Sequence, residues 1–461
     1  MRRLRKGMGM NMKNVAFHNL GCKVNSYEIE VMQQKLQEKG YNIVSFDQAA
    51  DIYIINTCTV TNIADRKSRQ MLHRAKQKNP EAVVVAVGCY VQTGGDVIEK
   101  DESIDLAIGN NRKKDIVEIL EEYLETRKDK TLGGSTVLDM SRTCEYEEMQ
   151  LKRTAEHTRA YIKIQDGCNQ FCSYCAIPLA RGRVRSREAG NILKEIQGLV
   201  DAGYREVVLT GIHLSSYGID FDRHGDPPGS RLMDLIEKIH EIEGLKRIRL
   251  GSLEPRIVSE ETAKRLAALP KLCPHFHLSL QSGCDATLKR MNRHYTTGEY
   301  YESVELLRRF FDNPAITTDV IVGFPGETEE EFAQTQAFLE KVRFYEMHIF
   351  KFSARNGTAA AKMPDQVAEA VKTRRSSALF DLERRQSKEF RGRYIGKEAE
   401  VLLEEIKNIQ GENYLLGHTK DYVKLAVPLP EDRTGAGKIE TVSVKGFLTD
   451  EILQAELICT R

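Results

Sequence analysis

The feature that most constrains the fold of this chain is an alternation of short apolar runs with longer amphipathic stretches. In the first part, apolar runs at residues 15–19, 52–56 and 83–87 suit buried parallel strands, and a fourth strand candidate lies at residues 105–108. Helix-like stretches lie at about residues 25–38, 62–77 and 115–126. Strands that alternate with helices in this way predict an α/β fold with a doubly wound parallel sheet.

The same alternation returns in the middle of the chain. Its six strand candidates, separated by helical stretches, lie at residues 160–165, 206–210, 247–250, 275–280, 317–322 and 348–352. Six βα units are too few for a closed eight-unit barrel, so the sequence predicts an open, partial (βα)6 barrel. Thr328 and Glu331 also have the spacing of a capping box at the start of a helix.

The last part of the chain changes character near residue 392. Four short strand candidates separated by turn residues predict a small β-barrel, with the oligonucleotide-binding type as one possibility. The predicted domains are an N-terminal α/β domain (13–127), a polar linker (128–153), the partial barrel (154–391) and the small β-barrel (392–461).

Composition restricts the location of the protein and the role of its cysteines. The formal net charge of +1 argues neither for nor against a nucleic-acid partner. No apolar run approaches the roughly 18 residues of a membrane span, and the basic start lacks the apolar core of a signal peptide. We therefore expect a cytoplasmic protein with no membrane contact. In a reducing compartment, the ten cysteines of a large chain more often bind metal or do redox chemistry than form disulfides.

Three cysteines, Cys168, Cys172 and Cys175, directly follow the first strand of the predicted barrel. Thiolates at this spacing can hold one iron–sulfur cluster. Three protein ligands leave one iron of a four-iron cluster open to another molecule, as in catalytic metal sites. The alternative, a structural zinc knuckle, normally has a fourth Cys or His close by. The carboxyl end of a barrel strand is where active sites lie, which favours a catalytic cluster.

A second set consists of Cys22, Cys58 and Cys89, which are far apart in the sequence. Each directly follows one of the first three predicted strands. The carboxyl ends of parallel strands share one edge of the sheet, and ligands bind at that edge. We therefore expect a second three-cysteine cluster; the alternative is three unrelated structural cysteines.

These motifs resemble known families. Cys168-Asn169-Gln170-Phe171-Cys172-Ser173-Tyr174-Cys175 resembles the signature of the radical S-adenosylmethionine (SAM) superfamily, and nearly the whole chain resembles the methylthiotransferase family within it. The final β segment resembles the TRAM domain of that family. The other motifs that carry the resemblance are Leu20-Gly21-Cys22-Lys23-Val24-Asn25, Asn56-Thr57-Cys58-Thr59-Val60, Gly88-Cys89-Tyr90, Ser279-Leu280-Gln281-Ser282-Gly283 and Gly323-Phe324-Pro325-Gly326-Glu327-Thr328.

The resemblance implies a transferase with two [4Fe-4S] clusters and two SAM-dependent half-reactions. SAM would be cleaved to a 5′-deoxyadenosyl radical at Cys168, Cys172 and Cys175. The cluster at the other three cysteines would carry the sulfur that is methylated and inserted.

The residues around Cys22 resemble one branch of this family in particular. That branch adds a methylthio group to C2 of N6-threonylcarbamoyladenosine at position 37 of tRNA. Two alternatives remain within the family, methylthiolation of N6-isopentenyladenosine or of a ribosomal protein aspartate. A non-catalytic iron–sulfur protein that binds RNA or relays electrons is an alternative of another class. The expected partners are the tRNA anticodon loop, an external electron donor such as a flavodoxin, and a sulfur donor.

Four further residues are candidates for SAM binding. Tyr174 matches the family position that packs near the adenine of SAM, although it equally suits the barrel core. Gly211 lies in a turn that can present backbone groups to the amino acid part of SAM. Glu254 and Gln281 follow the third and fourth barrel strands, so we expect them to face the active site; otherwise they satisfy loop backbone.

RNA contacts are expected from a basic run beyond the cysteine loop. Arg181, Arg183 and Arg185 can guide a phosphate backbone to the site. The basic run at residues 289–293 is interpreted as solvated surface. In the last domain, Lys420 and Tyr422 can contact RNA, with Tyr422 stacking on a base or serving as an ordinary strand tyrosine.

Overall fold

The structure is a computed structural model that describes residues 12–126, 134–153, 158–221, 229–429 and 436–458. Its residues form two units. The first contains Met1–Thr143, Glu147–Leu151 and Leu179–Arg181, and the second contains Cys144–Tyr146, Lys152–Pro178 and Gly182–Arg461.

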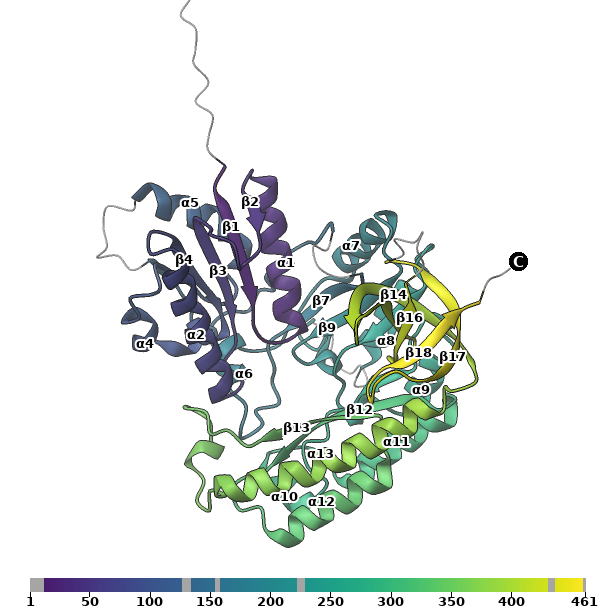
Figure 1. The fold of residues 1–461 in the computed structure, drawn as a ribbon. Helices are drawn as coiled ribbons and strands as arrows, with labels where there is room; N and C mark the ends of the chain where they lie inside the picture. The colour runs from purple at the N-terminus through teal and green to yellow at the C-terminus, as the bar shows by residue number, and fades with distance from the viewer. Residues whose placement is uncertain (1–11, 127–133, 154–157, 222–228, 430–435, 459–461) are drawn as a thin grey trace, which may run out of the picture. The chain divides into compact units, whose positions relative to one another are not determined.

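A six-stranded parallel sheet forms the first unit (Figure 1). Every residue of its two central strands β3 and β4 is buried, as expected for a parallel sheet covered on both faces. The three-residue strands β2 and β6 lie outside the strands that the sequence predicts. In spatial order the strands are β2 (Asn42–Val44), β1 (Asn14–Asn19), β3 (Ile52–Thr57), β4 (Val83–Gly88), β5 (Leu106–Ile108) and β6 (Gly134–Thr136).

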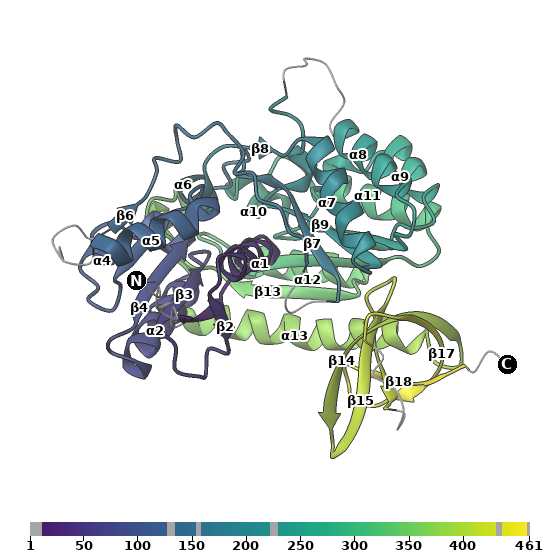
Figure 2. The ribbon, with the colours of Figure 1, turned by 90° about the horizontal axis from the view of Figure 1, so that it is seen from above.

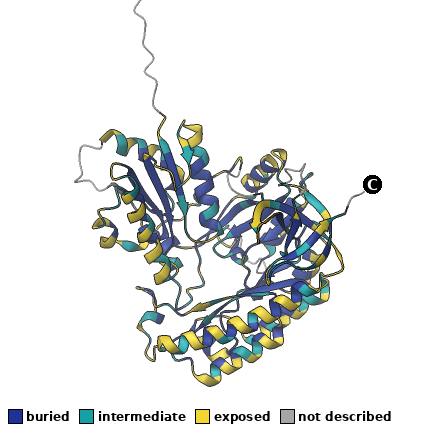
Figure 3. Cartoon of the chain, viewed as in Figure 1, coloured by how far each residue is buried: buried dark blue, intermediate teal, exposed yellow. Residues whose placement is uncertain are grey.

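Helices pack on this sheet through apolar faces. Leu72 and Ala75 of α2 (Asn62–Lys78) pack with Tyr53 and Val84 of the sheet. Figure 3 shows the dark blue strands beneath helices whose outer faces are exposed. The other helices of the unit are α1 (Lys23–Glu38), α3 (Cys89–Gly94), α4 (Asp96–Glu99), η1 (Lys113–Asp115) and α5 (Ile116–Thr126).

The strand order creates a topological switch point between β1 and β3. From β1 the chain passes to β2 on one side, and then crosses to β3 on the other side. Ligands of open α/β sheets bind at such a point, beyond the carboxyl ends of the strands. The segments after β1, β3 and β4 lie at that edge.

The second unit contains the partial barrel, which confirms the predicted fold. Its parallel strands form two sheets, joined by isolated bridges such as that between Leu253 and Leu278. The capping box of Thr328 and Glu331 is present at the start of α12. The strands are β7 (Ala160–Asp166), β9 (Glu206–Gly211), β10 (Arg247–Leu250), β11 (His275–His277), β12 (Ala315–Val322) and β13 (Glu346–Lys351), with the short antiparallel β8 (Arg185–Ser186).

Helices follow most of these strands. They are α6 (Ile177–Arg181), α7 (Ala189–Asp201), η2 (Leu214–Ser216), α8 (Ser230–His240), η3 (Pro255–Ile257), α9 (Glu260–Ala267), α10 (Asp285–Arg290), α11 (Thr297–Phe310), α12 (Glu329–Val342) and η4 (Ala360–Lys362). Among the residues that the structure describes, no helix has the length and apolar character needed to cross a bilayer.

The long helix α13 (Glu369–Gly392) packs beside β13 and leads into a small closed β-barrel (Figure 2). Its core includes Val401, Leu415 and Val442. The small barrel confirms the prediction, although β18 lies beyond the four strand candidates that the sequence offers. In spatial order its strands are β14 (Glu398–Ile409), β15 (Glu412–Thr419), β16 (Lys424–Pro428), β18 (Leu453–Leu457) and β17 (Ile439–Phe447).

Two buried arginines of β10 join the small barrel to the partial barrel. Arg249 donates to the carbonyl of Lys420 at 2.8 Å, and Arg247 donates to the carbonyl of His418 at 3.0 Å. Both guanidiniums share the buried carboxylate of Glu206, at 2.7 Å from Arg249 and 3.6 Å from Arg247. The charge of Glu206 therefore compensates two cations that have left water.

We expect Glu206→Gln to lower the free energy of unfolding by about 3–5 kcal/mol, because it leaves the buried guanidinium of Arg249 without its carboxylate and leaves Arg247 with Glu400 as its carboxylate partner. Urea unfolding followed by circular dichroism measures this. The control is Glu237→Gln, which removes a carboxylate that is 42% exposed and pairs with Arg265; its expected cost is below about 1 kcal/mol. An equal loss of unfolding free energy in the two variants would contradict the role of Glu206 as a buried counter-charge.

Candidate iron–sulfur sites

In the first unit, three strand ends carry cysteines. Cys22 precedes α1, Cys58 follows β3, and Cys89 begins α3 directly after β4. Gly21 and Gly88 precede two of these cysteines with φ angles of +115° and +99°. A Cβ atom on Gly88 would lie 2.6 Å from the side-chain oxygen of Asn56, so this turn requires glycine.

The three thiols influence one another electrostatically. Burial, together with the neighbouring Cys89 and Cys22, raises the pKa of Cys58 to about 12. Although part of Cys22 is exposed, the surrounding protein atoms raise the pKa of its thiol, and the positive charge of Arg181 opposes that rise. Three neighbouring thiolates require positive charge between them, which the iron atoms of a cluster supply.

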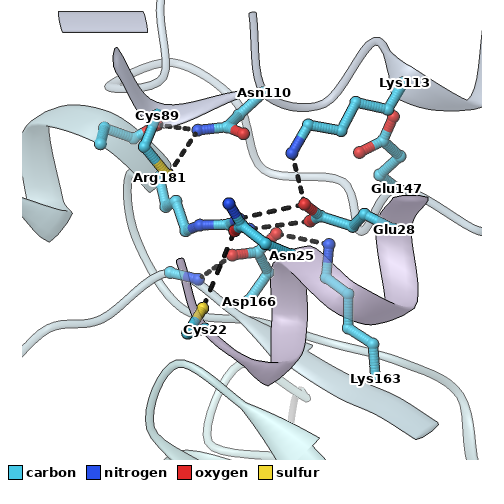
Figure 4. A network of polar contacts seen from close by, with 12 residues as sticks. Cys22, Asn25, Glu28, Cys89, Asn110, Lys113, Glu147, Lys163, Asp166 and Arg181 are labelled. Carbon is cyan, nitrogen blue, oxygen red and sulfur yellow. Dashed lines mark hydrogen bonds and ion pairs between the residues drawn. The ribbon is translucent and has the colours of Figure 1, made fainter. Parts of the chain in front are cut away.

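Two asparagine side chains contact this cysteine set (Figure 4). Asn25 donates to the carbonyls of Leu20 (2.7 Å) and Thr57 (3.1 Å), and its oxygen lies 3.8 Å from the sulfur of Cys22. Asn110 donates to the sulfur of Cys89 at 3.6 Å. Sequence reasoning missed both residues. Asn25 lies within the motif around Cys22, whereas Asn110 has no comparable sequence signal.

The prediction that Arg181 contacts RNA is wrong. Arg181 is 0% exposed, and its guanidinium donates to both oxygens of Glu28, at 2.8 and 3.1 Å, and to the oxygen of Asn25 at 2.8 Å. Lys113 contacts the same Glu28 carboxylate. The charge of Arg181 is therefore engaged inside the protein (Figure 4).

Arg185 is also wrong as an RNA contact. Its side chain is buried, donates to the carbonyl of Arg183 at 3.0 Å, and lies 3.7 Å from the carboxylate of Asp166. Arg183 itself is exposed, with its guanidinium 4.4 Å from the ring centre of Phe171. Its contact with RNA stays a prediction.

The stacking role predicted for Tyr422 is wrong as well. Its ring stacks on His418 and His275, with ring centres 4.6 and 5.1 Å away, and the guanidiniums of Arg159 and Arg249 lie 4.9 and 4.8 Å from its centre. These side chains of the second unit therefore occupy the space around the ring of Tyr422 in which a base would have to stack. Lys420 donates to the carbonyl of Pro270 at 3.3 Å, and its RNA contact stays a prediction.

The second cysteine set lies on the loop between β7 and α6. Gly167, directly before Cys168, has a φ of +70°, and a Cβ atom there would lie 1.8 Å from the carbonyl oxygen of Arg183. The amide of Cys168 donates to Gly182 at 3.1 Å, and the amide of Ser173 donates to Met291 at 3.0 Å. Backbone contacts thus fix both ends of the cysteine loop.

A cation faces this second set. Arg293 donates to the sulfur of Cys172 at 3.2 Å and to the hydroxyl of Tyr295 at 3.0 Å. Tyr295 in turn donates to the carbonyl of Leu280 at 2.8 Å. Burial raises the pKa of Cys168 to about 11 and that of Cys175 to about 12. Sequence reasoning missed Arg293, because a basic run gives no sign that one of its members turns inward.

Glu254 is linked to the cysteine loop. Its carboxylate accepts from the side chain of Gln170 at 3.4 Å and lies 3.5 Å from the imidazole of His213. Burial opposes its charge, but His213 and then Arg256 outweigh that effect and lower its pKa to about 2. Glu254 therefore carries a negative charge at neutral pH.

The remaining SAM candidates lie at strand ends or in the core. Gln281 has a left-handed φ of +74° and bridges to Val320 of β12. A Cβ atom on Gly211 would lie 2.9 Å from the side-chain oxygen of Gln165. Tyr174 packs edge-on against Phe324, with ring centres 6.4 Å apart. Their roles in SAM binding stay predictions.

Within the described part of the chain, the one trio of His, Cys, Asp or Glu whose ligand atoms all lie within 4.8 Å of one another is His277, Asp319 and His348. A tetrahedral zinc ion with sulfur ligands at about 2.3 Å would bring thiolates to within roughly 4 Å of one another. Among the described residues, neither cysteine set forms so close a trio.

We expect Gly167→Ala to lower the iron content of the protein severalfold, because the added methyl group collides with backbone at a positive φ. Iron analysis after anaerobic reconstitution measures this. Gly190→Ala is the control, since Gly190 lies in α7 with no atom within 4 Å of its added Cβ. Full iron content in Gly167→Ala would contradict the proposed loop geometry.

Two family models match the chain. The Radical SAM superfamily matches residues 162–339, which include the second cysteine set. The Uncharacterized protein family UPF0004 matches residues 14–109, which include the first set. Both cysteine sets therefore lie within recognised family regions.

Curated relatives match almost the full chain. It is 41% identical to the threonylcarbamoyladenosine tRNA methylthiotransferase MtaB of Bacillus subtilis (strain 168), over 92% of each chain. The MtaB relative from Aquifex aeolicus (strain VF5) is also 41% identical, over 87% of this chain and 95% of the relative. A tRNA-2-methylthio-N(6)-dimethylallyladenosine synthase of Thermoanaerobacter sp. (strain X514) is 34% identical, over 94% of this chain and 90% of the relative.

A solved structure shares the fold. The radical S-adenosylmethionine methyltransferase TsrM from Kitasatospora setae matches with a TM-score of 0.54 at 15% identity, over 74% of this chain and 72% of that chain. At this level of identity the similarity concerns the fold alone.

Proposed function

Since this chain belongs to the radical SAM methylthiotransferase family, we propose that it adds a methylthio group to C2 of N6-threonylcarbamoyladenosine at position 37 of tRNA. The observation that carries the proposal is the pair of three-cysteine sets, each at the carboxyl ends of parallel strands. The substrate branch is supported by 41% identity to the threonylcarbamoyladenosine enzymes, against 34% to the dimethylallyladenosine enzyme.

Both cysteine sets fit a [4Fe-4S] cluster with three protein ligands. Cys168, Cys172 and Cys175 would hold the cluster that binds SAM, and the set in the first unit would hold the auxiliary cluster. When bound, these groups supply reductive cleavage of SAM and the sulfur of the product. The reaction further needs an electron donor, such as a flavodoxin, and a sulfur donor, and we place it in the cytoplasm.

The residues beside the second set have electrostatic roles. Arg293 places a positive charge against Cys172, and this charge opposes the rise that burial causes in the pKa of Cys168 and Cys175. Glu254 stays ionised because its pKa is about 2, so it can accept hydrogen bonds from an ammonium or hydroxyl group of SAM. Gln170 and Arg256 orient that carboxylate.

The chemistry of the target explains the need for a radical enzyme. The C2–H bond of adenine is too weakly acidic for a side-chain base to remove its proton. The base must also leave its stack to reach an enclosed site, which is easiest in an unpaired loop.

The decisive assay uses an anticodon stem-loop that carries N6-threonylcarbamoyladenosine, with SAM, reductant and sulfide. Mass spectrometry of the nucleosides should show the 2-methylthio product, together with 5′-deoxyadenosine. Cys172→Ala should lose both. Cys58→Ala should still cleave SAM but form no product, because it damages only the auxiliary set.

Other outcomes identify the alternatives. Product formed only on RNA with N6-isopentenyladenosine would show that the substrate branch is wrong. Modification of a ribosomal protein aspartate instead would exclude the tRNA proposal. No deoxyadenosine from reduced wild-type protein would favour the non-catalytic iron–sulfur protein.

We expect Arg183→Ala to weaken binding of the stem-loop severalfold and to reduce the salt dependence of binding by about one phosphate contact. Arg183 is exposed beside the cysteine loop, where it lies over the exposed ring of Phe171. Fluorescence anisotropy at several salt concentrations measures both effects. Arg384→Ala, which removes an exposed arginine of α13, is the control. An equal loss of stem-loop affinity in both variants would refute a specific contact between Arg183 and the RNA.

A further inference from the structure

Two neighbouring residues of α6 contact both asparagines that touch the first cysteine set. The carbonyl of Ala180 accepts from Asn110 at 2.7 Å, and the guanidinium of Arg181 donates to the oxygen of Asn25 at 2.8 Å. The same amide of Asn110 reaches Cys89, and the same oxygen of Asn25 faces Cys22. Ala180 and Arg181 thus hold a side-chain amide against two of the three cysteines (Figure 4).

The arrangement is costly to build. Removing a guanidinium from water costs several kcal/mol, which an ion pair recovers only with good geometry and further hydrogen bonds. Arg181 meets these conditions through its bidentate ion pair with Glu28 and its hydrogen bond to the side-chain oxygen of Asn25. Although α6 begins two residues after Cys175 in the chain, Arg181 packs as part of the first unit.

A buried charge and an N–H donor at these positions have a specific effect on a cluster. Hydrogen bonds to cluster sulfurs, and the net charge around them, set the reduction potential. Donors and cations stabilise the reduced form, because it carries one more negative charge. Asn110 supplies a donor to Cys89, while Arg181 supplies a positive charge that acts on both Cys22 and Cys58.

We propose that Ala180 and Arg181 tune the auxiliary cluster: Ala180 positions the N–H donor of Asn110 against Cys89, Arg181 places a positive charge beside Cys22, and both raise the reduction potential of the cluster that these cysteines hold. This inference rests on the proposed function, which supplies the cluster. It replaces the RNA contact that the sequence predicted for the same arginine.

The test uses the full chain with Cys168→Ala, Cys172→Ala and Cys175→Ala, so that only the auxiliary cluster is reconstituted. Redox titration followed by electron paramagnetic resonance gives its midpoint potential. Arg181→Met removes the charge at similar volume, and Asn110→Leu removes the donor to Cys89 while the charge stays. Both are expected to shift the midpoint to more negative values, and Arg181→Lys is expected to recover part of the shift.

Arg187→Met is the matched control. Arg187 is an equally buried arginine that pairs with Glu195 and makes no described contact with either cysteine set. It should destabilise the fold but leave the midpoint potential unchanged, which separates an electrostatic role from a structural one. Should Arg181→Met fail to fold, Asn110→Leu still tests the proposal, because it preserves the buried ion pair.

The outcomes separate this inference from the proposed function. An auxiliary cluster with the same midpoint potential in the parent, Arg181→Met and Asn110→Leu would overturn the tuning role alone. A shift of similar size in Arg187→Met would also overturn it. A parent that holds no cluster at Cys22, Cys58 and Cys89 would overturn both this role and the proposed auxiliary cluster.

Discussion

A parallel sheet brings the carboxyl end of every strand to the same edge, and both candidate sites depend on that constraint. In the first unit it gathers cysteines that are far apart in the sequence, beside the switch point between β1 and β3. In the second unit the cysteine loop leaves β7 at the equivalent end of a partial barrel, and Glu254 follows β10. One geometric rule therefore produces two sites from unrelated stretches of chain.

Buried arginines are the second recurring element of the structure. Arg181, Arg185, Arg187, Arg247 and Arg249 are among the largest fully buried side chains. Arg181 pairs with the carboxylate of Glu28, and Arg249 pairs with that of Glu206. Each of these carboxylates compensates a positive charge that is shielded from water. These pairs fix segments whose placement matters: Arg181 beside Cys22, and Arg249 where the small barrel meets β10.

The sequence was sufficient to place the cysteines at strand ends, because that signal is local. Each follows an apolar run, and the strand period is readable without tertiary information. The sequence does not show which charged side chains are buried. For this reason it predicted RNA contacts for Arg181 and Arg185, and base stacking for Tyr422. Asn110 and Arg293 were missed because only folding brings them to the sulfurs.

The central claim is that each cysteine set holds its own cluster, and counting iron and sulfide tests it most directly. Full-length protein reconstituted without oxygen should contain about eight irons and about eight sulfides per chain. Removal of Cys22, Cys58 and Cys89 should leave about four of each, with the spectrum of a single [4Fe-4S] cluster. If that variant retained the iron of the wild type, the three strand-end cysteines would hold no cluster and the account would be wrong.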